Sequence, residues 1–294
     1  MTVELVEVPC GLGLLPRGVE KAPAALRHAG LPQRLGVHRV HTVPCPSAGS
    51  ARDEETALLR PAELIGMATR LADAIGRVLD AGALPVVVGG DCSILLGSML
   101  ALRRRGRYGL LYVDGHADFW HPSQDDLGEA ASVDLALATG RGPSIVTNLE
   151  GLVPLVRDED VAVLGYRSTV NDSYLDEHVR DTAITVEGLG DVERDGIHAC
   201  TERALATAAR PDLDGFWLHF DVDVLDDALM PAVDYREPGG LSWEQAGHTL
   251  AAAAASGHLA GVQLTIYNPA LDAPGAPLAG SIVDLLASGL AASL

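Results

Sequence analysis

The sequence predicts an α/β fold built on one mainly parallel sheet of about eight strands. Short apolar segments alternate along the chain with longer segments that carry apolar residues at helical spacing, which is typical of βαβ units. The apolar runs are continuous, as in Pro85-Val86-Val87-Val88, and such runs suit strands buried on both faces. At 294 residues with 48% hydrophobic content, the chain can bury a large core. It shows no linker and no internal repeat, so we expect a single domain over residues 1–294.

The individual elements follow from these patterns. The predicted strands are Val3–Val8, Val37–Val40, Leu84–Val88, Gly109–Val113, Val161–Gly165, Ala183–Val186, Phe216–Asp221 and Gly261–Tyr267. The segments between them are rich in Ala, Leu and Arg. We expect helices at Glu63–Ala81, at Ile94–Arg104, at Ala199–Arg210, and from an N-cap at Ser242 through Ala251–Ala255.

Two irregular connections interrupt this alternation, at Pro44–Glu55 and at His121–Ser132. The first is rich in proline, serine and charge, and the second follows an aspartate-rich run. Long connections above a sheet often shape a substrate pocket. We therefore expect both loops to border a functional site.

The composition disfavours several classes of partner. A net charge of −19 argues against nucleic acid and against anionic membrane surfaces. No apolar stretch reaches the length of a membrane span, and the N-terminus has no basic region followed by an apolar run, as a signal peptide would. The four cysteines lack metal-finger or redox spacing, which favours a reducing cytoplasm. Three of them, Cys10, Cys45 and Cys200, are interpreted as small buried or loop residues.

Ligand-type side chains follow three of the predicted strands. These runs are Asp91-Cys92, Asp114-Gly115-His116-Ala117-Asp118 and Asp221-Val222-Asp223. In an open α/β sheet, ligands bind beyond the carboxyl ends of the strands. Residues two apart on an extended segment face the same way, so the aspartates and the histidine within each run can face one point. One Asp-x-Asp is commonly just a polar strand end, but three such ends together predict a site for two divalent cations such as Mn²⁺.

As a set, these segments resemble the arginase/agmatinase/formiminoglutamase family, the ureohydrolases. The segment 89–93 (Gly-Gly-Asp-Cys-Ser) looks like the family's Gly-Gly-Asp-His-Ser, and 114–118 looks like its Asp-Ala-His-x-Asp. The segment 219–226 looks like Ser-x-Asp-x-Asp-x-x-Asp-Pro without the final proline. Further similar segments lie at 18–31, 164–167, 238–242 and 268–272, in the family's order.

The resemblance implies a three-layer αβα domain with a binuclear Mn²⁺ site at the carboxyl edge of the sheet. Carried over by position, Asp114 and Asp221 would bridge the two ions. Cys92 and Asp118 would complete the shell of one ion, and His116 and Asp223 that of the other. A hydroxide between the ions would attack the amidine carbon of a small guanidino-type substrate. The resemblance also implies a homo-oligomer, either a trimer or a hexamer.

The chain departs from the family at a metal ligand, because Cys92 stands where the family has histidine. A metal-bound thiol is deprotonated, so an anion replaces a neutral ligand. Four aspartates and one thiolate carry about −5 against +4 from two divalent ions. Thiolate also shifts the preference from Mn²⁺ towards Zn²⁺, or leaves that position partly occupied. The alternative is a buried thiol that binds no metal.

Two further departures concern the substrate and the proton transfers. Ile266 stands where typical members place a glutamate that pairs with the substrate guanidinium, and Gln263 is the nearest polar residue in that strand. The loop residues 128–134 lack the proton-shuttling histidine of arginase-like members. His121 and His219 are therefore the candidate acid–base residues. The alternatives are a solvated loop residue for His121 and a packed histidine for His219.

These features predict a metal-dependent hydrolase of C–N bonds in linear amidines, acting on a substrate other than plain arginine or agmatine. A second hypothesis is a non-catalytic or single-metal protein that keeps the fold for a binding or structural role. A third is a deacetylase related to histone deacetylases, which the Gly-Gly-Asp and Asp-x-Asp-x-x-Asp motifs fit less well.

Overall fold

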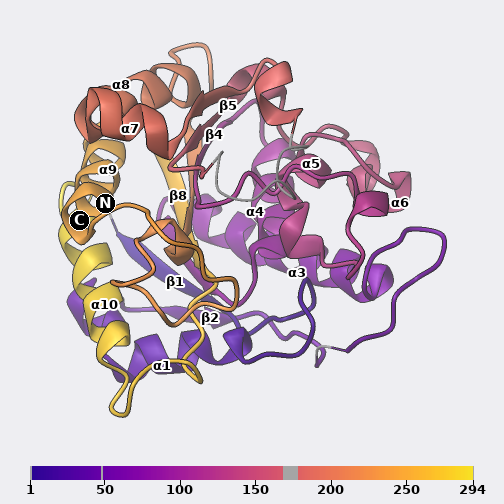
Figure 1. Ribbon diagram of the computed structural model, residues 1–294, viewed down its shortest axis with the longest axis horizontal. Coiled ribbons are helices and arrows are strands. Elements are labelled where there is room, and N and C mark those ends of the chain that lie inside the picture. Colours follow the sequence, from indigo (N-terminus) through magenta and orange to yellow (C-terminus); the bar gives the residue numbers. More distant parts are fainter. Residues whose placement is uncertain (1, 48, 168–177, 294) are drawn as a thin grey trace.

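The computed structural model describes residues 2–47, 49–167 and 178–293, and it places eight parallel strands in one sheet (Figure 1). The strands are β1 (Val3–Val8), β2 (Val40–Thr42), β3 (Leu84–Gly89), β4 (Gly109–Val113), β5 (Val161–Leu164), β6 (Thr185–Glu187), β7 (Phe216–Asp221) and β8 (Leu259–Thr265). Their order is β2-β1-β3-β8-β7-β4-β5-β6. The predicted α/β fold with a parallel sheet is confirmed. The chain order and the spatial order differ, so β3, β8, β7 and β4 lie together at the centre.

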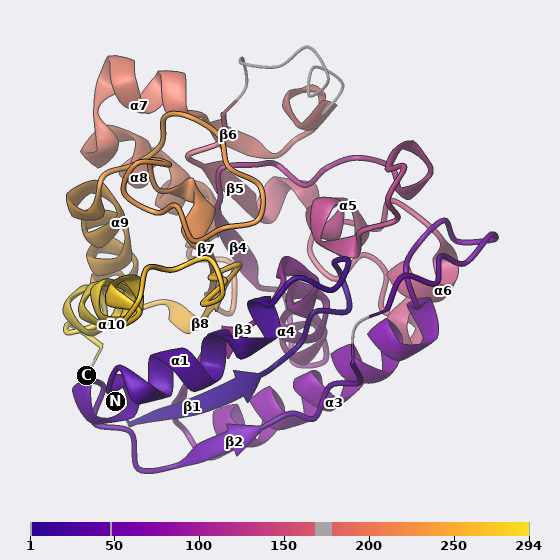
Figure 2. The ribbon, with the colours of Figure 1, turned by 60° about the horizontal axis from the view of Figure 1, so that its bottom comes forward.

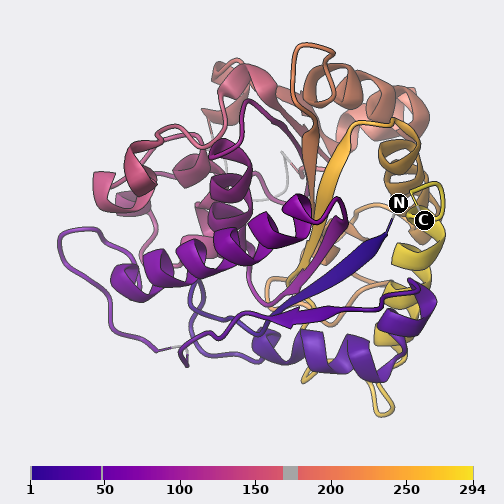
Figure 3. The same ribbon diagram turned by 180° about the vertical axis from the view of Figure 1, so that it is seen from behind.

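Helices cover both faces of this sheet, which confirms the three layers (Figures 2 and 3). Helices α1 (Ala22–His28), α8 (Ile197–Ala208), α9 (Trp243–Ala255) and α10 (Pro277–Gly289) pack on one face. Helices α3 (Pro61–Asp80), α4 (Leu95–Arg103) and α5 (Asp134–Ala138) pack on the other. The shorter helices are α2 (Leu31–Arg34), α6 (Ser144–Thr147) and α7 (Leu189–Asp195). Among the described residues, every helix is too short or too polar to cross a membrane.

The predicted elements are recovered with shifted ends. The second strand lies at Val40–Thr42 rather than Val37–Val40, because its register is set by pairing with β1, where Leu5 faces Val40. The predicted N-cap at Ser242 is confirmed: its hydroxyl accepts from the backbone N–H of Gln245 at 3.1 Å, and the Gln245 side chain accepts in return from the N–H of Ser242 at 2.8 Å. Helices α1, α2, α5, α6, α7 and α10 were not predicted.

The two irregular connections contact each other. Arg52 in the first loop donates to the carbonyl of Asp125 in the second at 2.7 Å, and the N–H of Leu59 donates to the carbonyl of Gly128 at 2.8 Å. The second loop contains short 3₁₀ turns at Pro122–Gln124 and Ala130–Ser132. Of the first loop, Ala48 lies outside the described residues.

Cys10 and Cys45 are joined by a disulfide across a sequence separation of 35 residues. The interpretation of these two cysteines as separate buried or loop residues is therefore wrong. It failed because Cys10 follows β1 and Cys45 follows the neighbouring strand β2, a proximity that sequence spacing does not reveal. The cysteine pattern consequently no longer argues for a reducing compartment. Cys92 and Cys200 are free and buried.

Removing this disulfide should lower the free energy of unfolding by about 3–4 kcal/mol, because the bond restricts a loop of this length in the unfolded chain. The measurement is chemical denaturation of the protein with and without reductant. The double variant Cys10→Ser/Cys45→Ser is the control and should not respond to reductant. Equal unfolding free energies of the native protein in both conditions would show that the bond does not contribute.

Candidate metal centre

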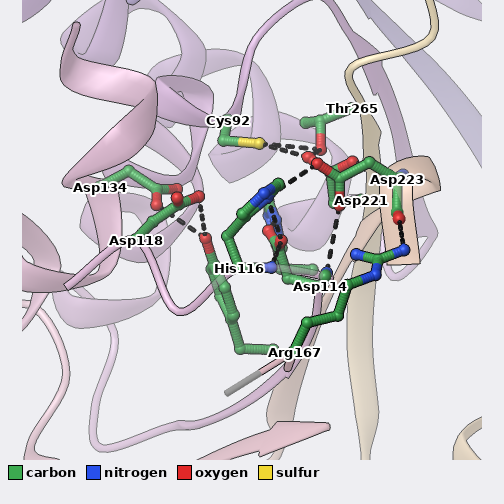
Figure 4. A network of polar contacts seen from close by, with 12 residues as sticks. Cys92, Asp114, His116, Asp118, Asp134, Arg167, Asp221, Asp223 and Thr265 are labelled. Atoms are coloured by element: carbon green, nitrogen blue, oxygen red, sulfur yellow. Dashed lines mark hydrogen bonds and ion pairs between the residues drawn. The ribbon is translucent and has the colours of Figure 1, made fainter. Parts of the chain in front are cut away.

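The candidate ligands lie at the carboxyl ends of the central strands. Asp114 follows β4, Asp221 ends β7, and Cys92 follows the Gly89-Gly90 turn after β3. Strands β4 and β7 are neighbours, and β8 alone separates β7 from β3. This strand order brings three segments that are far apart in the sequence to one edge of the sheet, as their predicted site requires (Figure 4).

Two groups of potential ligand atoms form at this edge. Cys92, Asp114, His219 and Asp221 offer atoms that all lie within 4.8 Å of one another, and so do Asp114, His116 and Asp223. The two groups share Asp114. Most of these side chains are buried, with Asp114 at 0% exposure and Cys92 at 2%.

Backbone N–H groups orient the carboxylates. Asp114 accepts from the N–H of His116 at 2.7 Å, and Asp221 accepts from the N–H of Asp223 at 2.7 Å. The N–H of Gly115 donates to the Asp223 carboxylate at 3.1 Å and thereby links the two runs. The Asp114 and Asp221 bonds each join residues two apart, and each stabilises a turn at the end of its strand, β4 or β7.

The position of the Arg167 side chain requires a glycine at position 115, between Asp114 and His116. Its guanidinium donates to the backbone carbonyls of Asp223 at 2.6 Å and of Leu225 at 3.0 Å (Figure 4). A Cβ atom at Gly115 would lie 1.7 Å from the Arg167 Nη1 atom. Glycine at position 115 therefore lets the guanidinium pass behind the Asp114 run and support the Asp223 run.

Burial and mutual repulsion shape the protonation of the site. Burial, and then the Asp223 carboxylate, raise the pKa of Asp221 well above its ordinary value and also raise the pKa of Asp114. Burial, and then Asp221, raise the pKa of the Cys92 thiol. That thiol donates to Asp221 Oδ2 at 2.7 Å. Without a bound cation, these raised pKa values favour the protonated forms of Asp114, Asp221 and Cys92, which reduces the repulsion between them.

His116 and Asp223 form an ion pair, with Nδ1 and Oδ2 2.9 Å apart. Burial lowers the pKa of His116, but the neighbouring Asp223 outweighs this and raises it to about 10. The same pairing overcomes burial and lowers the pKa of Asp223. This group is thus a protonated imidazole held by a carboxylate, and a cation would have to displace that proton.

Asp118 lies outside both groups of ligand atoms. Its Oδ2 atom accepts from the Tyr112 hydroxyl at 2.9 Å, and the same hydroxyl lies 2.8 Å from Asp134 Oδ1. Figure 4 shows Asp118 beside Asp134, apart from Asp221 and Asp223. A phenol has one proton and donates to one of the two carboxylates at a time, and burial raises the pKa of Asp134 well above its ordinary value. The family resemblance implies a metal-ligand role for Asp118, and in this structure its carboxylate contacts Tyr112.

The two candidate acid–base histidines have different surroundings. His121 is exposed, and its Nδ1 atom lies 2.8 Å from the Ser123 hydroxyl at the start of a 3₁₀ turn. His219 is fully buried between Asp114 and Gln263. The structure therefore brings His219 to the ligand atoms and places His121 in a local turn.

Sequence reasoning missed two residues and misplaced a third. Tyr112 and Asp134 contact Asp118 without belonging to a recognisable motif. Gln263, considered as a weak substitute for the family's glutamate, instead bonds to Trp217 and His219 inside the sheet. The sequence did contain a signal for this. Side chains alternate between the two faces of a strand, so Gln263 and Ile266, three residues apart, are expected on opposite faces.

The family model of the arginase family matches residues 1–293. This chain belongs to the arginase family. It is 28% identical over 279 residues to the arginase of Bacillus caldovelox, with 92% of each chain covered. The native structure of the Bacillus caldovelox arginase superposes with a TM-score of 0.89 at 25% identity, and covers 98% of both chains. The arginase structure from Bacillus cereus has a TM-score of 0.85 at 26% identity, also over 98% of both chains.

The chain is thus an arginase-family hydrolase with candidate metal ligands at the expected edge of the sheet. The donor set fits two divalent cations in type: one group offers two carboxylates and a thiol, with the His219 imidazole beside them, and the other offers two carboxylates and an imidazole. Carboxylate and imidazole suit Mn²⁺, and the thiol favours a softer ion in its group.

Cation binding should tighten as the pH rises. A ligand-competent His116 must lose the proton that it holds up to about pH 10 in the metal-free protein. Below that pKa, each displaced proton makes the apparent dissociation constant fall about tenfold per pH unit. Calorimetric Mn²⁺ titrations at about pH 7, 8 and 9 test this, with buffers of different ionisation enthalpy to count the protons released. An affinity independent of pH would contradict the protonated pair.

Proposed function

We propose that this chain hydrolyses a C–N bond in a small linear amidine, with two divalent cations, Mn²⁺ foremost, bound by Cys92, Asp114, His116, Asp221 and Asp223. The observation that carries the proposal is the pair of ligand groups that share Asp114 at one sheet edge. When bound, the two cations supply an activated water and polarise the amidine. By resemblance, the protein is one domain and assembles into a trimer or a hexamer.

The protein residues have separate tasks in this proposal. Asp114 belongs to both groups and would contact both cations, while Asp221 and Asp223 would each serve one. Arg167 orients the Asp223 run by bonding to backbone carbonyls. Asp118 and Asp134 are linked through the Tyr112 hydroxyl beside the site.

The substrate is proposed to differ from plain arginine and agmatine. Ile266 is only 7% exposed and carries no charge, so it cannot compensate a buried guanidinium. Its backbone adopts a φ of 70°, which is unfavourable for a β-branched residue, and its N–H donates to the carbonyl of Gly90 at 2.7 Å. A less basic amidine, such as a formimino compound, suits an apolar neighbour better than a guanidinium does.

A substrate panel tests the proposal directly. Purified protein loaded with Mn²⁺ or Zn²⁺ is incubated with guanidino, formimino and amide compounds, and released urea, ammonia and amine are measured. We expect turnover of at least one formimino or substituted guanidino compound, with arginine and agmatine poorer. Two bound cations together with no turnover across the panel would overturn the proposal.

Ile266→Glu should raise kcat/KM for arginine, by about tenfold or more, because a carboxylate here could pair with the guanidinium. Glutamate also tolerates the positive φ better than isoleucine does. Ile266→Gln is the matched control, since it has the same length without the charge, and it should give no comparable gain. Equal kcat/KM values for the two variants would show that position 266 does not contact the substrate cation.

A single-metal or non-catalytic role is the second candidate. The observation that favours it is the orientation of Asp118 towards Tyr112 and Asp134, which leaves the first group without that carboxylate and with a thiol where the family has histidine. Metal analysis by mass spectrometry separates the two candidates. One tightly bound ion per chain without turnover would support the second.

A further inference from the structure

A line of buried polar side chains crosses the sheet behind Asp114. Trp217 and His219 lie on β7, Gln263 lies on β8 directly opposite His219, and all of them have 0% exposure. The Trp217 Nε1 atom is 3.0 Å from Gln263 Oε1. The Gln263 Nε2 atom is 2.7 Å from His219 Nδ1, and His219 Nε2 is 3.3 Å from Asp114 Oδ2.

The direction of every hydrogen bond in this line follows from its first member. An indole N–H can only donate, so it must face the amide oxygen of Gln263. The amide nitrogen of Gln263 therefore faces His219, and because this nitrogen has no lone pair to offer, it must donate to Nδ1. The Nδ1 atom is then unprotonated, and the imidazole carries its proton on Nε2, which faces Asp114.

We propose that Trp217, Gln263 and His219 form a one-way hydrogen-bond relay that holds His219 as a neutral Nε2–H donor to Asp114. His219 is then a positioning residue of the metal centre, and neither a metal ligand nor an acid–base group. The relay itself follows from the hydrogen bonds, whereas its effect on cations rests on the proposed function.

The relay excludes a ligand role for His219 although its ring lies among the ligand atoms. To bind a cation through Nε2, the imidazole would have to move its proton to Nδ1, against the amide N–H of Gln263. Flipping the Gln263 amide would turn its oxygen towards His219, but its NH2 group would then face the indole N–H of Trp217. Either arrangement opposes two fully buried donors, which costs about 1–3 kcal/mol for each unsatisfied group.

The relay also excludes proton transfer by His219. Its Nε2 atom already bears a proton, and its Nδ1 atom is occupied by the Gln263 amide. The ring is further held by stacking on Tyr112, with centroids 4.3 Å apart and planes inclined by 6°. The ring therefore cannot rotate towards another partner without losing this contact.

The consequence for Asp114 is a fixed carboxylate. His219 donates to its Oδ2 atom, while the N–H of His116 donates to its Oδ1 atom at 2.7 Å. Each carboxylate oxygen has a second lone pair, which stays available for a cation. Partners of this kind, which orient a ligand from behind, commonly account for 10–100-fold in metal affinity.

The tautomer of His219 is directly measurable. Nitrogen-15 NMR of the imidazole side chains distinguishes Nε2–H, Nδ1–H and doubly protonated rings, and the His219→Gln variant assigns the signal by its loss. The metal-free and Zn²⁺-loaded proteins are compared, since Zn²⁺ is diamagnetic. We expect the Nε2–H form in both. An Nδ1–H or doubly protonated ring in either, or loss of the Nε2 proton on Zn²⁺ binding, would overturn the relay.

Gln263→Glu reverses the relay and gives an independent test. A carboxylate at 263 accepts from Trp217 and also from His219 Nδ1–H, so Nδ1 should gain a proton and the signal should change to the Nδ1–H or the doubly protonated form. Gln263→Met is the matched control of similar size that imposes neither direction. An unchanged Nε2–H signal in the Gln263→Glu variant would contradict the relay. This test is separate from that of the proposed function. An Nε2–H signal without turnover would refute the proposed function alone, and turnover with an Nδ1–H signal would refute the relay alone.

Discussion

Asp114→Asn should abolish binding at both cation positions and lower kcat/KM by about 1000-fold or more. Asp114 is the member that the two ligand groups share, so one substitution weakens both. Asparagine has the same size, and its single amide oxygen can still accept from the N–H of His116, while its NH2 group then faces His219. The measurements are metal content by mass spectrometry and turnover of the best substrate from the panel.

Asp118→Asn is the matched control for this prediction. It is the same change on a neighbouring aspartate that is also buried and whose carboxylate bonds to Tyr112 outside both groups. It should retain both cations, with a loss of metal affinity of less than about tenfold. If Asp118→Asn emptied a position as fully as Asp114→Asn, Asp118 would rotate into a metal shell when cations bind, as the family pattern implies.

Cys92→His should tighten Mn²⁺ binding by about 10–100-fold. In the native chain, a cation must first remove a thiol proton that burial and Asp221 hold strongly. A neutral imidazole needs no such step and suits Mn²⁺ better than thiolate does. It also lowers the anionic charge of the ligand set by one, because a neutral group replaces a thiolate. Calorimetric titration with Mn²⁺ measures the change.

Cys92→Ser separates a gained ligand from a lost thiol. Serine is close in size to cysteine and can donate to Asp221 as the thiol does, but it offers neither thiolate nor imidazole. It should show no gain in Mn²⁺ affinity and should lose Zn²⁺ affinity relative to the native chain. Unchanged Zn²⁺ affinity in Cys92→Ser would mean that Cys92 is a buried thiol that does not bind the cation, and that the other residues of its group hold the cation without it.

Much of the fold could be predicted from local patterns. Continuous apolar runs identified the central strands, because a parallel strand buried on both faces tolerates few polar residues. The edge strand β2 was less well placed, since its exposed residues give no such pattern and its register depends on β1. Helix α10 was missed because its small and apolar residues continue directly from a turn-rich segment.

The sequence by itself determined which side chains stand at the carboxyl ends of β3, β4 and β7, because strand ends and residue alternation are local properties. Only the tertiary structure decided which of them meet. It turned Asp118 towards Tyr112 and Asp134, joined Cys10 to Cys45, and placed Gln263 behind His219. The physical reason is that a hydrogen bond or a disulfide requires two groups at the right distance and orientation. When the two residues are far apart in the chain, local sequence patterns do not determine that orientation.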